Sequence, residues 1–407
     1  MPNLALVPSP GALTSDAPFV PAGLPAADAS PAAIRLTPGP ARPTGEAQSG
    51  PSPLGRRRIF GALKGLVPSK APAMADRGGI PGLEAAIRIV EAQGHGEANL
   101  VRMADKDILL SGDGEAFVMH ARRGRSLIAL SDPVGAAEAF PDLVERFVGL
   151  ARDQGLRPVF YQISPGLLGP CFEAGLKTLK LGEQAVVDLE GFDLKGGKWQ
   201  SLRRNLNRAE RDGLAFAFVP VSDVPALLGE LQTVSDEWLA ATRAREKSFS
   251  LGSFMPDYLA TQPVAVVRLD GRLVAFASVL TTPLRQSAFI DLMRFVPGVH
   301  RSLMDLLFIK VMEHLRSDGF SALNLGMAPL SGLADADGAP LWNQLGRTIF
   351  ECGESFYNFQ GLRAFKSKFE PQWQSRYLAV PANANPYLAV MDVALLISGG
   401  LRGVFGK

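Results

Sequence analysis

From about residue 80 onward, short apolar runs alternate with amphipathic segments of helical spacing, and this alternation restricts the chain to layered α/β folds. The helical segments lie at about 80–91, 136–154, 224–241 and 301–315. The strand-like runs lie at 107–110, 116–121, 126–130, 158–163, 215–219, 264–278, 287–294 and 322–326. The second half repeats the scheme of the first, so the sequence predicts one arrangement built twice.

The clearest turn signal in the second half is Asp270-Gly271, which predicts a hairpin over 264–278. The order of hairpin, strand, helix and strand is similar to the centre of the N-acetyltransferase-like acyltransferase fold. We therefore expect an α/β (α+β) protein with two such domains in tandem, at 79–195 and 196–385, the second of them catalytic.

The N-terminal part has a different composition from the rest. Twelve of the 31 prolines precede residue 55, and fixed φ angles and missing N–H donors oppose regular structure there. We expect a disordered Pro/Ala-rich tail at 1–55. A basic amphipathic linker follows at 56–78, where cations alternate with Ile, Phe, Leu and Val; contact with a membrane surface and a solvated linker both remain open. The last segment, 386–407, is expected to be amphipathic.

The overall charge excludes a polycation that binds nucleic acid with its whole surface. Lys and Arg number 42 and Asp and Glu 40, which gives a net charge of +2. Two cysteines far apart exclude a disulfide framework or a thiolate metal site. The sequence has neither an apolar run of spanning length nor a secretory signal. We expect a cytoplasmic protein, peripheral on the inner face of the plasma membrane.

Several motifs occur together in one order. They are DKD at 105–107, SDPVG at 131–135, VFYQ at 159–162, LKLGE at 179–183, SLRRNLNRA at 201–209, DLMR at 291–294, NLGMAPLSG at 324–332 and FYNF at 356–359 continuing to Pro371. In this order the motifs resemble the cytoplasmic catalytic domain of the phosphatidylglycerol lysyl/alanyltransferases, the multiple peptide resistance factors, over about 80–404. The resemblance implies transfer of an amino acid, lysine or alanine, from aminoacyl-tRNA to phosphatidylglycerol. This sequence is expected to lack the multi-span flippase portion of the full-length members.

Asp291 and Arg294 are the candidate catalytic residues. They stand three positions apart near the end of the strand that lines the acceptor site in this fold. A carboxylate can accept a proton or hold the substrate amine, and a guanidinium can bind phosphate or an oxyanion. A strand-end salt bridge is the alternative interpretation of this spacing.

Further polar side chains are candidates for substrate binding. Two basic groups are suited to binding the lipid phosphate or tRNA. The first is a stripe on a helix, formed by Arg203, Arg204 and Arg208. The second lies among aromatic residues and consists of Arg363, Lys366 and Lys368. Solvated or structural helix faces are the alternatives. Glu183, in an expected Gly-Glu turn, and Asn324 and Ser331, in the loop after a strand, are candidates for the substrate amine or pocket; capping and turn roles stay open.

The sequence predicts no metal and no bound organic cofactor. A pyrophosphate site for CoA needs backbone N–H donors in the loop at 295–302. This loop has only one glycine, and its proline lacks an N–H, so the sequence disfavours CoA binding. Two alternatives to aminoacyl transfer remain. One is an acyl-CoA or acyl-carrier-dependent N-acyltransferase that makes an amino-acid lipid, and the other is a non-enzymatic module that binds membranes or RNA.

Overall fold

The computed structural model describes residues 79–242, 244–332 and 359–399, all within one compact unit. The expected tail at 1–55, the basic linker at 56–78, motif residues 356–358 and the last residues of the C-terminal segment, 400–407, lie outside the described residues.

The first half of the described chain contains three α-helices and six strands in mixed order. Its elements are α1 (Leu83–Glu91), the 3-10 helix η1 (Gly96–Met103), β1 (Asp107–Leu110), β2 (Ala116–Arg123), β3 (Ser126–Leu130), β4 (Val134–Gly135), α2 (Phe140–Asp153), β5 (Arg157–Ile163), α3 (Leu168–Glu173) and β6 (Leu176–Asp188). Short 3-10 turns η2 (Ala137–Ala139) and η3 (Pro165–Leu167) precede α2 and α3.

The second half is longer and ends in a helix. Its elements are α4 (Gln200–Arg211), β7 (Leu214–Val219), α5 (Val224–Thr242), α6 (Pro256–Leu259), β8 (Val264–Leu269), β9 (Arg272–Leu280), β10 (Ser287–Phe295), α7 (Leu303–Ser317), β11 (Ala322–Pro329), α9 (Phe359–Ser367), β12 (Gln372–Pro381) and α10 (Pro386–Ile397). The 3-10 turns η4 (Gly197–Trp199) and η5 (Val221–Asp223) precede α4 and α5.

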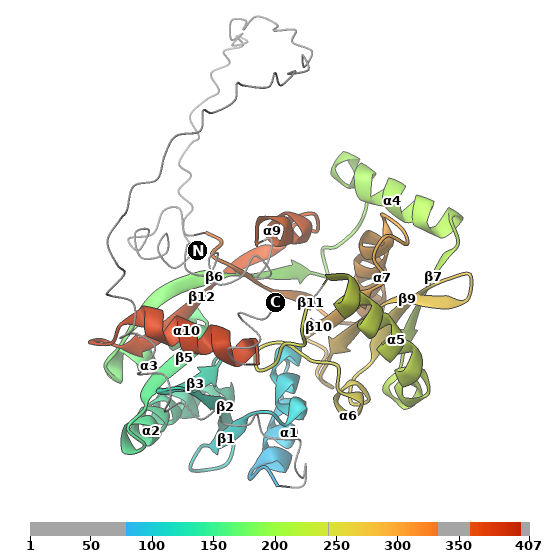
Figure 1. Cartoon of the computed structure of the whole chain (residues 1–407). Helices are drawn as coiled ribbons and strands as arrows, with labels where there is room; N and C mark the ends of the chain where they lie inside the picture. Colours follow the sequence, from blue (N-terminus) through green and yellow to red (C-terminus); the bar gives the residue numbers. More distant parts are fainter. Residues whose placement is uncertain (1–78, 243, 333–358, 400–407) are drawn as a thin grey trace, which may run out of the picture. The chain divides into compact units, whose positions relative to one another are not determined.

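The described strands form one twelve-stranded sheet in the order β1-β2-β3-β5-β12-β6-β11-β10-β9-β8-β7, with β4 paired to β2 (Figure 1). Each half contains antiparallel strands followed by a helix and a parallel strand. In the first half β3 pairs in parallel with β5 after α2, and in the second β10 pairs in parallel with β11 after α7. This confirms the expected α/β class and the repeated order of elements.

The predicted hairpin turn is confirmed in detail. Asp270 and Gly271 connect β8 to β9 with φ angles of 50° and 81°. Both residues therefore occupy the left-handed region that a two-residue hairpin turn requires, which Asp and Gly tolerate.

Two strands that the sequence did not predict join the halves. β12 comes late in the chain but lies between β5 and β6, and β6 pairs with β12 on one side and β11 on the other. Glu183 therefore lies within β6, so its expected placement in a turn was wrong. Because the sheet runs through the junction without interruption, the division into domains at 195 and 196 stays a prediction.

Helices cover both faces of the sheet in each half. In the first half α2 and α3 pack on one face, while α1, η1 and α10 pack on the other. In the second half α4, α7 and α9 cover one face, and α5 and α6 cover the other. The core under η1 and α10 also includes Phe249, Tyr258 and Phe289, so apolar packing crosses the junction. In the described ranges, no helix combines the length and apolarity that crossing a bilayer requires.

Candidate active site

A bulge in β10 brings Asp291 and Arg294 to the same face of the sheet. On a regular strand, residues three positions apart point to opposite faces. The register of β10 against β9 shifts by one residue between Ile290 and Met293, and the extra residue reverses the alternation. Both side chains accordingly contact the segment 238–258.

Asp291 is held by two donors from that segment. Its Oδ1 accepts from the backbone N–H of Gly252 at 2.6 Å, and its Oδ2 accepts from the Tyr258 hydroxyl at 2.8 Å. A Cβ at position 252 would lie 1.9 Å from Oδ2, so only glycine permits this approach. Burial raises the pKa of Asp291 above the ordinary aspartate value, although both hydrogen bonds lower it.

The first half contributes a charged pair to the same place. Lys106 is 3% exposed and forms an ion pair with Asp105 at 2.5 Å. Asp105 also accepts from the backbone N–H of Phe249 at 3.0 Å. The positive charge of Lys106 lowers the pKa of Asp291, though less than burial raises it. The motif at 105–107 was noted in the sequence, but its proximity to Asp291 was not predicted.

Arg294 is surrounded by other charged and aromatic groups. Its guanidinium forms an ion pair with Glu246 at 3.1 Å and lies 4.3 Å from the centre of the Trp238 ring. Burial, together with the charge of Arg294, lowers the pKa of Lys247 to about 8. Asp291 and Arg294 thus border a buried cluster that contains ionisable groups from both halves.

Lys366 is the most deeply buried of the predicted basic residues. It is 6% exposed, and its Nζ donates to the backbone oxygens of Gly326 and Met327 at 2.9 and 3.0 Å. Burial lowers the pKa of Lys366 to about 7. A Cβ at Gly326 would lie 3.7 Å from this amine and 3.8 Å from Phe289 in β10, so the amine lies beside the strand that carries Asp291.

Asn324 lies within β11, so its expected placement in the loop after a strand was wrong. It fixes the backbone of this strand near Lys366. Its Oδ1 accepts from the N–H of Gly326 at 2.8 Å, and its Nδ2 donates to Glu97 at 2.8 Å. Glu97 also accepts from Gln184 at 2.8 Å and from Ser131 at 3.1 Å. Nothing in the sequence pattern singled out Glu97 as the acceptor of this buried group.

Replacing Asn324 by Asp is expected to destabilise the protein. The new carboxylate would lie 2.8 Å from Glu97, and a buried pair of like charges costs about 2 to 4 kcal/mol. Urea unfolding at pH 7 measures this loss, which should shrink at lower pH as one carboxylate takes a proton. Asn207→Asp, at an exposed position on α4, is the control; equal stability of the two variants would contradict the expectation.

Glu183 already has three partners. Its carboxylate accepts from Arg363 at 2.5 Å, Lys180 at 3.0 Å and Ser331 at 3.2 Å. Burial alone would raise the pKa of Glu183, but Arg363 and Lys180 outweigh it and lower that pKa. A substrate amine would therefore have to replace one of these donors.

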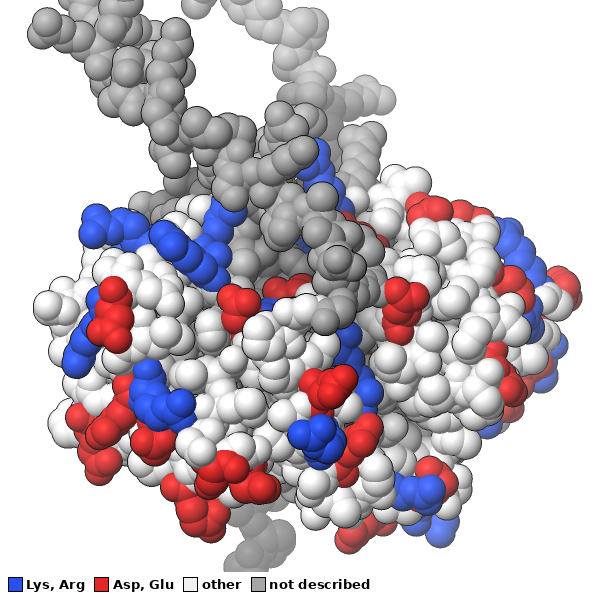
Figure 2. Space-filling model, turned by 90° about the horizontal axis from the view of Figure 1, so that it is seen from below, with Lys and Arg blue, Asp and Glu red and all other residues white. Residues whose placement is uncertain are grey.

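The remaining predicted basic residues lie on α4 and directly after α9. Arg203 donates to the backbone oxygens of Leu194 and Gly196, so it holds the preceding loop. Arg204 is exposed and Arg208 is half-buried on the same helix. Lys368 forms an ion pair with Asp305 at 2.9 Å. Figure 2 shows the molecule from below, and on that face basic and acidic side chains are interspersed.

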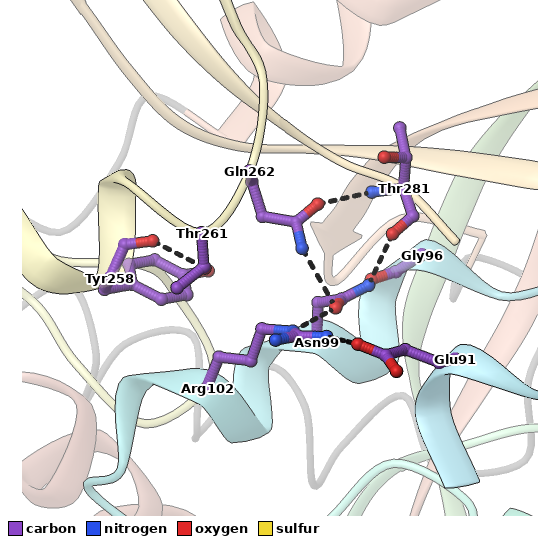
Figure 3. Close-up of polar contacts among 8 residues, drawn as sticks. All are labelled: Glu91, Gly96, Asn99, Arg102, Tyr258, Thr261, Gln262 and Thr281. Carbon is purple, nitrogen blue, oxygen red and sulfur yellow. Dashed lines mark hydrogen bonds and ion pairs between the residues drawn. The ribbon is translucent and has the colours of Figure 1, made fainter. Parts of the chain in front are cut away.

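A further group of polar contacts joins η1 to the segment that carries Tyr258 (Figure 3). The Asn99 amide donates to the Thr281 carbonyl at 3.0 Å and accepts from Gln262 at 3.1 Å. Gln262 in turn accepts from the Thr281 N–H at 2.9 Å. Because Gln262 lies three residues after the end of α6, these buried amides anchor the helix whose tyrosine donates to Asp291.

The described residues hold no group of three or more His, Cys, Asp and Glu side chains that could bind a metal ion. Among the residues above, Asp291 can accept a proton, and Arg294 and Lys366 can present cationic groups.

Known proteins resemble this chain over most of its folded part. The family described as "Phosphatidylglycerol lysyltransferase, C-terminal" matches residues 87–380. The phosphatidylglycerol lysyltransferase of Bacillus subtilis (strain 168) is 36% identical over 310 residues, which cover 75% of this chain and 36% of that protein. The Staphylococcus aureus (strain MRSA252) protein of the same name is 33% identical over 282 residues, 69% of this chain and 33% of that protein. The chain thus spans about a third of the length of these relatives.

Two solved structures match at high coverage. The C-terminal domain of a proposed lysylphosphatidylglycerol synthetase from Agrobacterium fabrum is 53% identical, with a TM-score of 0.72 over 79% of this chain and 98% of that one. L-PGS from Bacillus licheniformis is 34% identical, with a TM-score of 0.71 over 80% of this chain and 99% of that one. The resemblance found in the motifs is confirmed: the chain belongs to the family of phosphatidylglycerol lysyltransferase C-terminal domains.

Proposed function

We propose that this protein transfers an amino acid, lysine or alanine, from aminoacyl-tRNA to a glycerol hydroxyl of phosphatidylglycerol at the cytoplasmic face of the membrane. Membership of the family supports the lipid acceptor, because the relatives are named as phosphatidylglycerol lysyltransferases. The basic segment at 56–70 and the C-terminal segment at 386–407 would assist contact with anionic lipid.

The setting of Asp291 is the observation that carries the proposal. Tyr258 and Gly252 fix its carboxylate, and burial raises its pKa. A higher pKa makes the ionised carboxylate a stronger base. This suits a carboxylate that must take a proton from an alcohol.

The reaction needs little more than position, a base and cations. An aminoacyl ester is already activated. The lipid hydroxyl would attack its carbonyl carbon, an ester bond to the lipid would form, and the bond to the tRNA ribose would break. Asp291 would take the proton of the lipid hydroxyl and pass it to the departing ribose oxygen. Arg294 and Lys366 would stabilise the oxyanion or a phosphate.

The other predicted residues would bind substrate. Arg363 and Lys368 on and after α9, and Arg203, Arg204 and Arg208 on α4, would contact the lipid phosphate or the tRNA backbone. Glu183, Asn324 and Ser331 would shape the pocket for the substrate amine. The mechanism requires no cofactor.

The purified chain, charged tRNA and vesicles containing phosphatidylglycerol test the proposal. With tRNA carrying radiolabelled lysine or alanine, label should move into the organic phase, and mass spectrometry should find phosphatidylglycerol heavier by one amino-acid residue. Ribonuclease treatment of the tRNA beforehand should abolish the product. Label transfer that survives ribonuclease, or that requires an acyl thioester instead, would overturn the proposal.

A further inference from the structure

An open hollow lined by arginines lies in the first half, away from the residues discussed above. It has a volume of about 660 Å³. It lies between the turn after β2, the end of α2, the start of β5 and the chain that leads from β12 into α10. Arg125, Arg152 and Arg157 line it. The backbone N–H of Arg157 donates to the Arg125 carbonyl at 2.7 Å, which holds two of the three side by side.

The positive charge of the hollow is largely uncompensated. Within the described part of the chain, the side chains of Arg125 and Arg152 form neither an ion pair nor a hydrogen bond. Arg157 reaches Asp392 at 3.9 Å, and Asp392 also accepts from Ser126 at 2.7 Å. Arg122 and Arg123, at the end of β2, add two further cations to the same hairpin.

One exposed apolar side chain lines the hollow, and a second lies three residues before a residue of its lining. Leu388 lines the hollow and is 54% exposed. Phe172 is 78% exposed, and its carbonyl accepts from Gly175, another residue of the lining. On α10, Leu388 is followed at helical spacing by Met391 and Leu395, which are partly exposed, so an apolar stripe continues along the outside of this helix.

We propose that this arginine hollow, with Phe172 and the outer stripe of α10, docks the protein on an anionic lipid bilayer. Lipid phosphates would occupy the hollow, and the apolar side chains would enter the boundary between headgroups and acyl chains. An RNA backbone would use the arginines but would leave Phe172 and Leu388 exposed to water. Arginines combined with apolar groups therefore favour a membrane over RNA.

The docking surface is connected to the candidate active site by a single helix. α10 begins at the hollow, and the carbonyl of its last residue, Ile397, accepts from the N–H of Ser248 at 3.1 Å. Ser248 lies between Lys247 and Phe249, in the segment that faces Asp291 and Arg294. A helix of 12 residues is about 18 Å long, so docking would hold the site near the bilayer. This consequence rests on the proposed function, whereas the docking itself does not.

Vesicle binding by the full chain tests the docking surface. The double variant Arg125→Glu/Arg152→Glu is compared with Arg88→Glu/Arg301→Glu, which reverses two exposed arginines elsewhere. With vesicles containing phosphatidylglycerol, the first variant should show a partition coefficient lower by about 30-fold or more, since each cation at an anionic surface contributes about fivefold. The control should bind nearly as well as the unaltered chain. Equal binding by both variants, with unchanged thermal unfolding, would overturn the proposal.

A second measurement does not depend on charge. Phe172→Trp should add a fluorescence signal that brominated acyl chains quench, and an unquenched signal would contradict docking. If the double variant loses binding to tRNA on filters but retains binding to vesicles, the surface is an RNA contact and the proposal is wrong. When the lipid is supplied in detergent micelles, the double variant should still transfer the amino acid. Absence of transfer in every variant, and in the unaltered chain, would overturn the proposed function and leave the docking result unchanged.

Discussion

Replacing Asp291 by Asn is expected to lower aminoacyl transfer about 100-fold or more, which is the usual loss when a general base is removed. The amide has nearly the same shape but cannot take the proton of the lipid hydroxyl. The protein should still fold, because a neutral group at this partly buried position avoids the desolvation that raises the pKa of Asp291. Initial rates from charged tRNA to vesicle lipid, with thermal unfolding alongside, measure both effects.

The control for this variant is Asp270→Asn. Asp270 lies in the exposed hairpin turn of the same half, where Asn adopts the required positive φ equally well. Kinetics also separate two roles for Asp291. Loss of a base lowers kcat, whereas loss of a group that holds the substrate amine raises KM for the charged tRNA. Activity of Asp291→Asn equal to that of Asp270→Asn would remove Asp291 from the mechanism.

The pH dependence of transfer gives an independent check of the same residue. The base must be ionised, so the rate should fall as the pH decreases through the pKa of Asp291. Because burial raises this pKa, the fall should begin above the ordinary range of an aspartate. In Tyr258→Phe one hydrogen bond to the carboxylate is lost, and the acid limb should move to still higher pH.

Local signals in the sequence were sufficient for most of the fold. The Asp270-Gly271 turn and the helical periodicity of α7 depend on neighbouring residues, and both are where the sequence placed them. β6 and β12 were missed because their pairing is not local. β12 mixes polar and apolar residues, and its partners lie far back in the chain.

In the candidate site too, neighbouring residues predicted some features, while others depend on pairing between distant parts of the chain. The DLMR motif predicted Asp291 and Arg294 as a pair, but the bulge that turns them to one face depends on pairing with β9. Asp105 and Phe249 meet across 144 residues, and no spacing rule connects them. The basic residues of α4 and α9 were predicted by type, yet only the fold shows that Arg203 holds a loop and that Lys366 is buried.

The buried amine of Lys366 is expected to make stability rise with pH. In the unfolded chain a lysine has a pKa of about 10.5, whereas burial lowers the pKa of Lys366 to about 7. Below pH 7 both states hold the proton, and the folded state bears the full cost of burying the charge. Between pH 7 and about 10 only the unfolded state holds it, so each rise of one pH unit favours folding by up to about 1.4 kcal/mol.

Lys366→Met isolates this contribution, because the variant has no proton to lose. Urea unfolding at successive pH values measures the free energy of unfolding of both proteins. Between pH 7 and about 10, this free energy should rise for the unaltered chain by on the order of 4 kcal/mol more than for Lys366→Met. In the control Lys195→Met, at an exposed position, the free energy of unfolding should change with pH as it does in the unaltered chain. If the free energy of unfolding of Lys366→Met has the same pH dependence as that of the unaltered chain, then Lys366 keeps its charge through its bonds to Gly326 and Met327 and acts as a permanent cation. A pKa near 7 means instead that the amine can give its proton to an oxyanion beside β10, so transfer by Lys366→Met should fall and lose its dependence on pH in this range.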